Sequence, residues 1–288
     1  MEHLPGFASL AERYDGFILD LWGVIHDGVN AFPHAVDCLT KLRALGRRTL
    51  LLSNVPRPND AAQTMMRGMG IADDLYTDIL TSGEAVRRAL QRPPDLWWAE
   101  LGQRVFHLGP ERDRGVMEGL PLTQVARPSD ANFVLNTGPD DHRNPTEITE
   151  FEEVLQDCAR HHLPMICANP DLQVIRGGIR VLCAGSLALR YQELGGNVRS
   201  IGKPDAAIYQ PVLERLGLPV GRVLAVGDAL YTDIAGAAGV DIAACWVLGG
   251  IHGEALLDGT GSYDLARARA LADTEGVAPI ATVPRFAW

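Results

Sequence analysis

Short apolar runs alternate with helical patterns near the start of the chain. The first two runs are Gly16–Asp20 and Arg48–Ser53. Between them, apolar residues recur every three positions from Val36 to Leu45, and Gly46 follows as a helix stop. This order predicts a helix that connects two parallel strands.

The same order returns near the end of the chain. Apolar runs predict strands, and between them lie a helical stripe that ends before Gly217 and an Ala/Gly-rich helix suited to close packing on a sheet. The segments are, in order, Val198–Ile201, Ile208–Leu216, Arg222–Val226, Ile234–Gly239 and Asp241–Leu248. Hydrophobicity is continuous rather than alternating in the two longer strand segments, which is typical of strands buried on both faces.

The middle of the chain has a separate α/β pattern. It offers two strands, Asn132–Leu135 and Met165–Ala168, and a helix that we expect to open at Asn144-Pro145 with an apolar stripe from Phe151 to Cys158. The prediction is therefore an α/β protein. Its core is a Rossmann-like, doubly wound parallel sheet built from residues 1–98 and 198–288, and residues 99–197 form an inserted α/β cap domain.

Composition limits the classes of partner. The formal net charge of −10 argues against a nonspecific nucleic-acid or anionic-membrane surface, since both need a basic patch. Five scattered cysteines favour reduced, buried thiols over a disulfide framework. The first residues lack the basic region of a signal peptide, so we expect a cytoplasmic protein with no membrane partner. The patterns leave a homodimer open.

Four polar side chains follow predicted strands. Asp20, Ser53 and Asp228 each end an apolar run, and Lys203 follows a fourth. Because ligands bind beyond the carboxyl ends of parallel strands, we expect these groups at one sheet edge. Two carboxylates can hold Mg²⁺, and one of them can attack phosphorus. An ammonium and a hydroxyl can bind the phosphoryl oxygens, so the set suits phosphoryl transfer.

The order and spacing of these motifs resemble the haloacid dehalogenase superfamily, class IIA. This branch contains large-capped phosphatases of the sugar-phosphate and pyridoxal-phosphate type. The motifs are Asp20-Leu21-Trp22-Gly23-Val24, Leu52-Ser53-Asn54, Ala168-Asn169-Pro170-Asp171, Gly202-Lys203-Pro204-Asp205 and the segment from Gly227-Asp228 to Asp233.

The resemblance implies a role for each matching residue. Asp20 would be the nucleophile and Lys203 the neutralising cation. Ser53 would bind the phosphoryl group, Asn54 would shape that loop of the substrate site, and Asn169 and Asp171 in the cap would contact the substrate. The Mg²⁺ ligands would be Asp20, the backbone carbonyl of Trp22, Asp228 and Asp233. The substrate would be a small phosphorylated metabolite, hydrolysed through an aspartyl phosphate.

Trp22 is a departure from the family pattern. Phosphatases of this family usually carry a second Asp two residues after the nucleophile, and tryptophan cannot replace its acid–base work. One hypothesis is slow hydrolysis, or hydrolysis limited to good leaving groups, with His26 or Asp27 as substitute acids. A second is a different chemistry such as dehalogenation. A third is a protein that binds a phosphorylated ligand without turnover.

Overall fold

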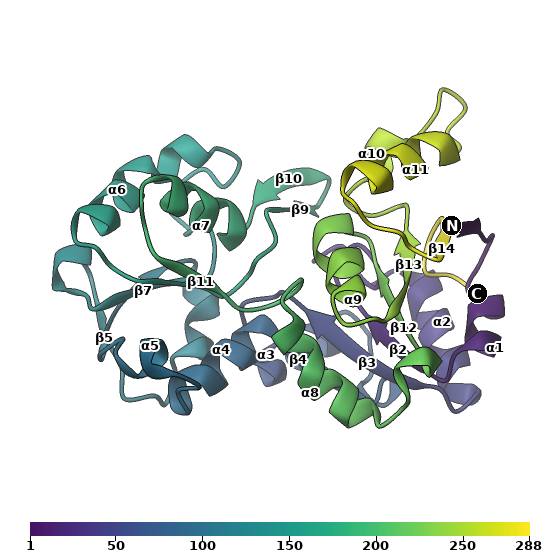
Figure 1. Ribbon diagram of the computed structural model, residues 1–288, viewed down its shortest axis with the longest axis horizontal. Helices are drawn as coiled ribbons and strands as arrows, with labels where there is room; N and C mark the ends of the chain where they lie inside the picture. The colour runs from purple at the N-terminus through teal and green to yellow at the C-terminus, as the bar shows by residue number, and fades with distance from the viewer.

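The apolar runs at both ends of the chain meet in one seven-stranded sheet, in a computed structural model that describes residues 1–288. All neighbouring strands in this sheet are parallel. Their order across the sheet is β1 (Glu2–His3), β14 (Ala281–Val283), β13 (Ala243–Val247), β12 (Val223–Gly227), β2 (Gly16–Leu19), β3 (Arg48–Ser53) and β4 (Asp78–Thr81). Strands β12 and β2 come from opposite ends of the chain and lie side by side (Figure 1).

Helices cover both faces of this sheet, which explains why its central strands β2, β12 and β13 carry apolar residues at consecutive rather than alternate positions. Along β2, Phe17 and Leu19 enter one hydrophobic cluster, and Ile18 enters the other. The first cluster includes residues of α1 (Ala8–Arg13), α2 (Pro33–Ala44) and α3 (Asn59–Gly68). The second includes residues of α8 (Ala206–Leu216), α9 (Ala235–Ala238), α10 (Gly253–Leu256) and α11 (Leu265–Thr274). The predicted doubly wound core is confirmed.

The helix termini follow their sequence signals closely at α8. Asp205 accepts a hydrogen bond from the backbone N–H of Ala207 at the N-terminus. Gly217 ends the helix in the left-handed conformation, with φ of 59°, as expected for a glycine at this position. The loop after Gly217 leads into β12, and Asp228 follows directly after the last residue of that strand.

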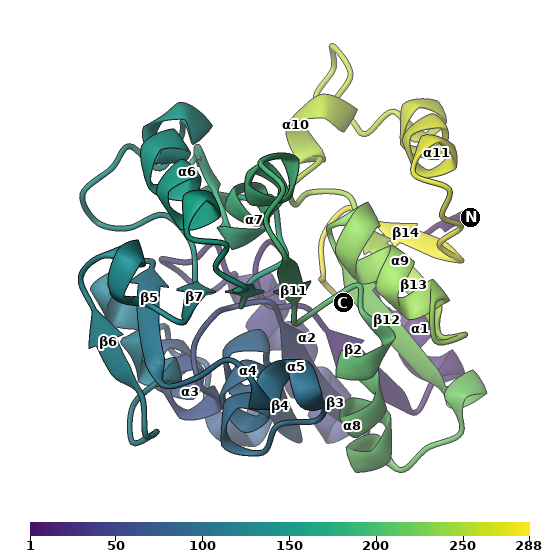
Figure 2. The ribbon, with the colours of Figure 1, turned by 60° about the vertical axis from the view of Figure 1, so that its left-hand side comes forward.

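A second sheet of five parallel strands forms the other lobe of the molecule (Figures 1 and 2). Its order is β11 (Val198–Ser200), β8 (Met165–Cys167), β7 (Phe133–Asn136), β5 (Arg104–Leu108) and β6 (Thr123–Val125). Helices α6 (Glu152–Arg160) and α7 (Ala184–Glu193) pack on it, and α4 (Ser82–Gln91) and α5 (Leu96–Ala99) contribute Val86 and Trp98 to a hydrophobic cluster with Phe133.

A two-stranded antiparallel hairpin lies beside the core lobe. It consists of β9 (Gln173–Arg176) and β10 (Ile179–Leu182). The two residues between the strands, Gly177 and Gly178, both have positive φ, as a tight two-residue hairpin turn requires. Figure 1 shows this hairpin between the two lobes. It therefore brings cap residues toward the edge of the core sheet.

Two expected elements differ from the structure. The strand at Val198–Ile201 forms as β11, but it pairs with β8, so the segment expected to reopen the core instead completes the second sheet. The helix expected to open at Asn144-Pro145 begins at Glu152, after a short 3-10 segment at Ile148–Phe151.

A turn at Asn144 explains the late start of this helix. The side chain of Asn144 accepts a hydrogen bond from Thr146 N, and the carbonyl of Pro145 accepts one from Leu182 N, which ties this segment to β10. The apolar stripe of α6 is buried as expected. We retain the division into core and cap as a proposal. None of the helices has the length and apolar character needed to cross a membrane.

Candidate active site

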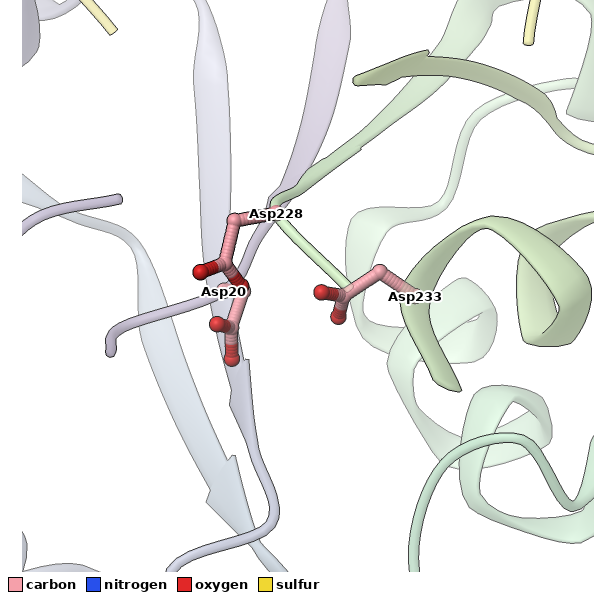
Figure 3. A group of neighbouring side chains, drawn as sticks. All are labelled: Asp20, Asp228 and Asp233. Atoms are coloured by element: carbon pink, nitrogen blue, oxygen red, sulfur yellow. The ribbon is translucent and has the colours of Figure 1, made fainter. Parts of the chain in front are cut away.

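The carboxylates of Asp20 and Asp228 lie at the ends of two adjacent core strands. Val226 of β12 is paired with Leu19 of β2, and the backbone N–H of Asp20 donates to the carbonyl of Val226. Asp233 reaches the same place from a π-helical turn at Leu230–Ile234. Figure 3 shows the three side chains pointing toward one another. Each offers an oxygen within 4.8 Å of the others, and all three are buried.

Lys203 is the cation of this cluster. Its Nζ donates to one oxygen of Asp20 and one of Asp233, both at 2.6 Å. The backbone of Lys203 is held by the Asn54 side chain, which accepts from its N–H at 2.8 Å and donates to its carbonyl at 3.0 Å. Asn54 thus connects the end of β3 to Lys203, which fixes the ammonium beside the predicted nucleophile.

Two glycines leave room for the Asp228 carboxylate. A Cβ on Gly23 or Gly250 would lie 2.1 Å or 2.0 Å from Asp228 Oδ2, closer than any side chain permits. The same oxygen accepts a hydrogen bond from Ile251 N at 2.7 Å. The indole N–H of Trp246 donates to the Asp228 backbone carbonyl. Asp228 is therefore held in one orientation by contacts on several sides.

The charges in this cluster do not balance. Burial raises the pKa of Asp20 to about 8, although Lys203 lowers it, and Asp233 raises it further. Burial and the two neighbouring carboxylates raise the pKa of Asp228 well above its ordinary value. Burial lowers the pKa of Lys203, but the surrounding carboxylates outweigh this and raise it well above its ordinary value. The ammonium of Lys203 does not balance the three buried carboxyl groups of Asp20, Asp228 and Asp233, so the cluster is suited to a divalent cation. Clustered carboxylate oxygens are the ligands that Mg²⁺ prefers.

The raised pKa of Asp20 predicts how stability changes with pH. Folded Asp20 keeps its proton to about pH 8, whereas the unfolded residue loses it near the ordinary pKa of 3.8. In this window the unfolded chain binds fewer protons, so we expect the melting temperature of the metal-free protein to fall as pH rises from about 4 to 8. Mg²⁺ at a hundredfold excess over its Kd should add about 2.7 kcal/mol near pH 8. Calorimetry in chelator and in Mg²⁺ measures both effects. A metal-free melting temperature that rises across this window, with no Mg²⁺ effect, would contradict the site.

Trp22 lies on the wall of the cavity and contacts the cap. Its indole N–H donates to the backbone carbonyl of Ile175 in β9 at 2.9 Å. The far edge of the ring packs on Gly28, where a Cβ would lie 2.2 Å away. The ring is therefore fixed, and it connects the nucleophile loop to the cap hairpin.

Neither suggested substitute acid has suitable properties. His26 is buried, its Nδ1 accepts from Gly28 N, and burial lowers its pKa to about 4, so it is neutral. Asp27 accepts hydrogen bonds from Val29 N and Asn30 N, and backbone hydrogen bonds lower its pKa, which keeps it ionised. A general acid needs a proton near neutral pH, and these two environments supply none.

Residues of the predicted cap loop reach the core. The side chain of Asn54 donates to Asp171 Oδ1 at 2.9 Å, and Asn169 Oδ1 accepts from Asp171 N at 3.0 Å. The hydroxyl of Tyr231 donates to the carbonyl of Pro170 and accepts from Leu172 N. The loop is therefore bonded to the core on both sides of Asp171.

A cavity of about 640 Å³ joins the carboxylate cluster to the cap. Asp20, Trp22, Asp171, Lys203, Asp228 and Asp233 all line it, together with apolar residues of the hairpin and of α7. Ser53, Asn54 and Asn169 are buried but are not among the lining residues. Ser53 Oγ accepts from Val55 N at 3.3 Å, in the turn that follows β3. The volume is within the usual range for a small-molecule site.

Sequence reasoning missed Tyr231, Gly250 and the contact made by the Trp22 indole. Gly249-Gly250 follows the β13 strand, and a glycine pair at a strand end signals a close approach of backbone to a site. Tyr231 lies between the two acidic residues Asp228 and Asp233, but nothing in its spacing points to the cap.

Comparisons with known proteins place these motifs in one family. The sequence model of the haloacid dehalogenase-like hydrolase family matches residues 17–122, and a related model for HAD-like hydrolases matches residues 200–273. Chronophin from Bos taurus is 29% identical over 252 residues, which cover 81% of each chain.

Solved structures agree with this placement. A haloacid dehalogenase-like hydrolase from Brucella suis 1330 has 32% identity and a TM-score of 0.81, covering 97% of this chain and 98% of its own. A glycerol phosphate phosphatase from Mycobacterium tuberculosis, in complex with calcium, has 24% identity and a TM-score of 0.60, covering 84% of this chain and 68% of its own. The chain therefore belongs to the haloacid dehalogenase-like hydrolases, class IIA, and is an enzyme of their phosphatase type with an α/β cap.

Proposed function

We propose that this protein is a Mg²⁺-dependent phosphatase that hydrolyses a small phosphorylated metabolite through an aspartyl phosphate on Asp20. The observation that carries the proposal is the convergence of the Asp20, Asp228 and Asp233 carboxylates beside Lys203 at the base of one cavity. Metal-assisted phosphoryl transfer needs this combination of a nucleophile, a cation site and an ammonium. The buried, unpaired cysteines support a cytoplasmic site of action.

Asp20 attacks phosphorus with one carboxylate oxygen, and Lys203 holds the other. The Nζ–Oδ1 contact of 2.6 Å orients the carboxylate and offsets its charge as a phosphoryl group approaches. We assign the phosphoryl oxygens to Lys203, the Ser53 hydroxyl and the adjacent backbone N–H groups. Asn54 holds Lys203 in place and contacts Asp171, so it links phosphate binding to the cap.

Asp20, Asp228, Asp233 and the backbone carbonyl of Trp22 would hold the Mg²⁺. When bound, the ion stabilises the negative charge that develops on the phosphoryl oxygens. Asp233 has a second task, since one of its oxygens accepts from Lys203 and the other from Ala229 N. It orders both the ammonium and the loop that carries Asp228.

The intact carboxylate cluster separates this proposal from the alternatives. Dehalogenation does not need a metal, whereas three clustered carboxylates leave a charge excess that favours a divalent ion. A protein that only binds a phosphorylated ligand gains little from a nucleophile oriented by an ammonium. The fixed Trp22 ring is the feature that favours this last alternative, because it occupies the usual acid position.

One panel experiment tests the proposal. Phosphorylated metabolites, acetyl phosphate and 4-nitrophenyl phosphate are incubated with the protein in Mg²⁺ and, separately, in chelator. We expect release of inorganic phosphate in Mg²⁺ only. Ligands that raise the melting temperature without releasing phosphate would support the binding protein and contradict turnover.

A further inference from the structure

The proposed reaction needs a proton donor on the cap side of the cavity. In an in-line displacement, the leaving oxygen lies opposite the attacking oxygen, and Asp20 attacks from the end of β2 in the core. The leaving oxygen therefore faces the cap. Trp22 has no acidic group that could donate a proton. The surroundings of His26 and Asp27 exclude them as acids.

Asp171 is one of two cap carboxyl groups that line this cavity. Its backbone N–H is bonded to Asn169, and Tyr231 binds the residues on either side of it. Helix α7 packs closely on the same loop, since a Cβ on Gly185 would lie 2.6 Å from the Asp171 carbonyl. These contacts fix the backbone of Asp171 against the core.

One oxygen of Asp171 is assigned by geometry. Asn54 Nδ2 donates to Oδ1 at 2.9 Å, and this bond persists whether the carboxyl group is charged or neutral. The proton of the neutral form then lies on Oδ2. The other cap carboxylate on the wall, Glu193, pairs with Arg190 at 2.8 Å.

We propose that Asp171, supplied by the cap, is the general acid and then the general base of the phosphatase reaction. The inference rests on the proposed function. In the first step an oxygen of Asp20 bonds to phosphorus, the bond from phosphorus to the leaving oxygen breaks, and the proton of Asp171 moves to that oxygen to give the alcohol. In the second step water attacks the aspartyl phosphate and gives a proton to the Asp171 carboxylate. The bond from phosphorus to Asp20 breaks, and inorganic phosphate is released.

The environment of Asp171 suits a group that gains and loses a proton near neutrality. Burial raises its pKa to about 6, opposed by Lys203 and the Asn54 hydrogen bond and reinforced by Asp233. The incoming phosphoryl dianion raises this pKa further. The other ionisable groups that act on Asp171 or respond to its charge are Asp20, Asp228, Cys167, Cys183 and Tyr231, and the nearby Thr232 side chain lowers the pKa of Asp171.

The role of Trp22 follows from the same arrangement. Its indole N–H binds the carbonyl of Ile175, a few residues beyond Asp171 on the same cap segment. Trp22 is thus a positioning residue that helps to hold the cap segment closed over Asp20. The cap segment therefore links Trp22, which stands at the usual acid position, to Asp171, which we assign as the acid.

The test compares two substrates of nearly equal shape in the Asp171→Asn variant. Asparagine keeps the oxygen that accepts from Asn54 but carries no acidic proton. Nitrophenolate is a weak base and leaves without a proton. Phenolate is a stronger base, so its departure depends more on proton donation. In single-turnover measurements with Mg²⁺, we expect release of phenol from phenyl phosphate to slow by about 10²–10⁴-fold, and release of nitrophenol to slow by less than about tenfold. A burst of nitrophenol followed by slow turnover is expected, because hydrolysis of the aspartyl phosphate lacks its base.

Three results distinguish a failure of the role proposed for Asp171 from a failure of the proposed phosphatase function. Equal losses on both substrates would overturn the role of Asp171, because loosening of the cap affects both alike. Failure of the unaltered protein to release phenol or nitrophenol from either substrate would contradict the proposed function itself. Asp157→Asn on α6, remote from the cavity, is the matched cap control and should leave both rates unchanged.

The unaltered protein gives a second measurement that needs no variant. Its kcat/KM for phenyl phosphate should fall as pH rises above the pKa of Asp171, and the value for 4-nitrophenyl phosphate should fall less. Parallel pH profiles for the two substrates would contradict proton donation by this carboxyl group.

Discussion

Replacement of Asp20 by asparagine should abolish turnover of every phosphorylated substrate while leaving the fold intact. The amide is a poor nucleophile and forms no acyl phosphate, so we expect kcat to fall by at least about 10³-fold. The variant keeps an oxygen that can accept from Lys203 Nζ, which preserves the local geometry. It also removes a buried carboxyl group whose pKa is raised to about 8. The metal-free variant should therefore melt no lower than the parent near pH 8.

Its control is Asp37→Asn on α2, which changes an exposed carboxylate paired with Lys41. The control should retain full activity, because such surface pairs contribute little. Two measurements compare the variants. One is release of inorganic phosphate from a substrate that is stable in mild acid, and the other is trapping of labelled phosphate on the protein. Retention of more than about a tenth of the activity by Asp20→Asn would exclude this residue as the nucleophile.

Replacement of Gly250 by alanine should disable the site by steric contact alone. The added Cβ would lie 2.0 Å from Asp228 Oδ2, and this glycine does not have a positive φ, so backbone strain does not contribute. The carboxylate must leave its observed position, which disturbs its hydrogen bond from the N–H of Ile251 and its place in the carboxylate cluster. We expect Mg²⁺ affinity and kcat to fall by about 10²-fold each, in line with losses on disturbing residues that orient metal ligands.

Gly259→Ala is the matched control, because nothing lies within 4 Å of a Cβ at this position. Titration calorimetry with Mg²⁺ and a phosphatase assay compare the two variants. Normal Mg²⁺ binding by Gly250→Ala would show that Asp228 is not needed in its observed orientation.

The strand-end logic predicted the core of the site because it depends on local patterns. Asp20 and Asp228 each follow a continuous apolar run, and adjacent parallel strands must bring such ends together. Lys203 was predicted as a neighbour of these carboxylates, but its strand β11 belongs to the second sheet. The choice between sheets depends on tertiary pairing, which a three-residue run does not encode.

Contacts between the lobes could not be predicted from spacing. The bonds from Trp22 to Ile175 and from Asn54 to Asp171 join residues more than a hundred positions apart. The start of α6 also depends on such a contact, because Pro145 is bonded to Leu182 of β10. Sequence patterns locate buried faces and strand ends, but the closing of a cap depends on the whole fold.

The most direct test of the carboxylate site is a crystal structure with Mg²⁺ and beryllium trifluoride, which mimics a phosphoryl group on aspartate. We expect the beryllium on one oxygen of Asp20, an ion that contacts both Asp20 and Asp228, and Lys203 Nζ beside a fluoride. An ion bound away from these two carboxylates, or a fluoride adduct on another residue, would contradict the site.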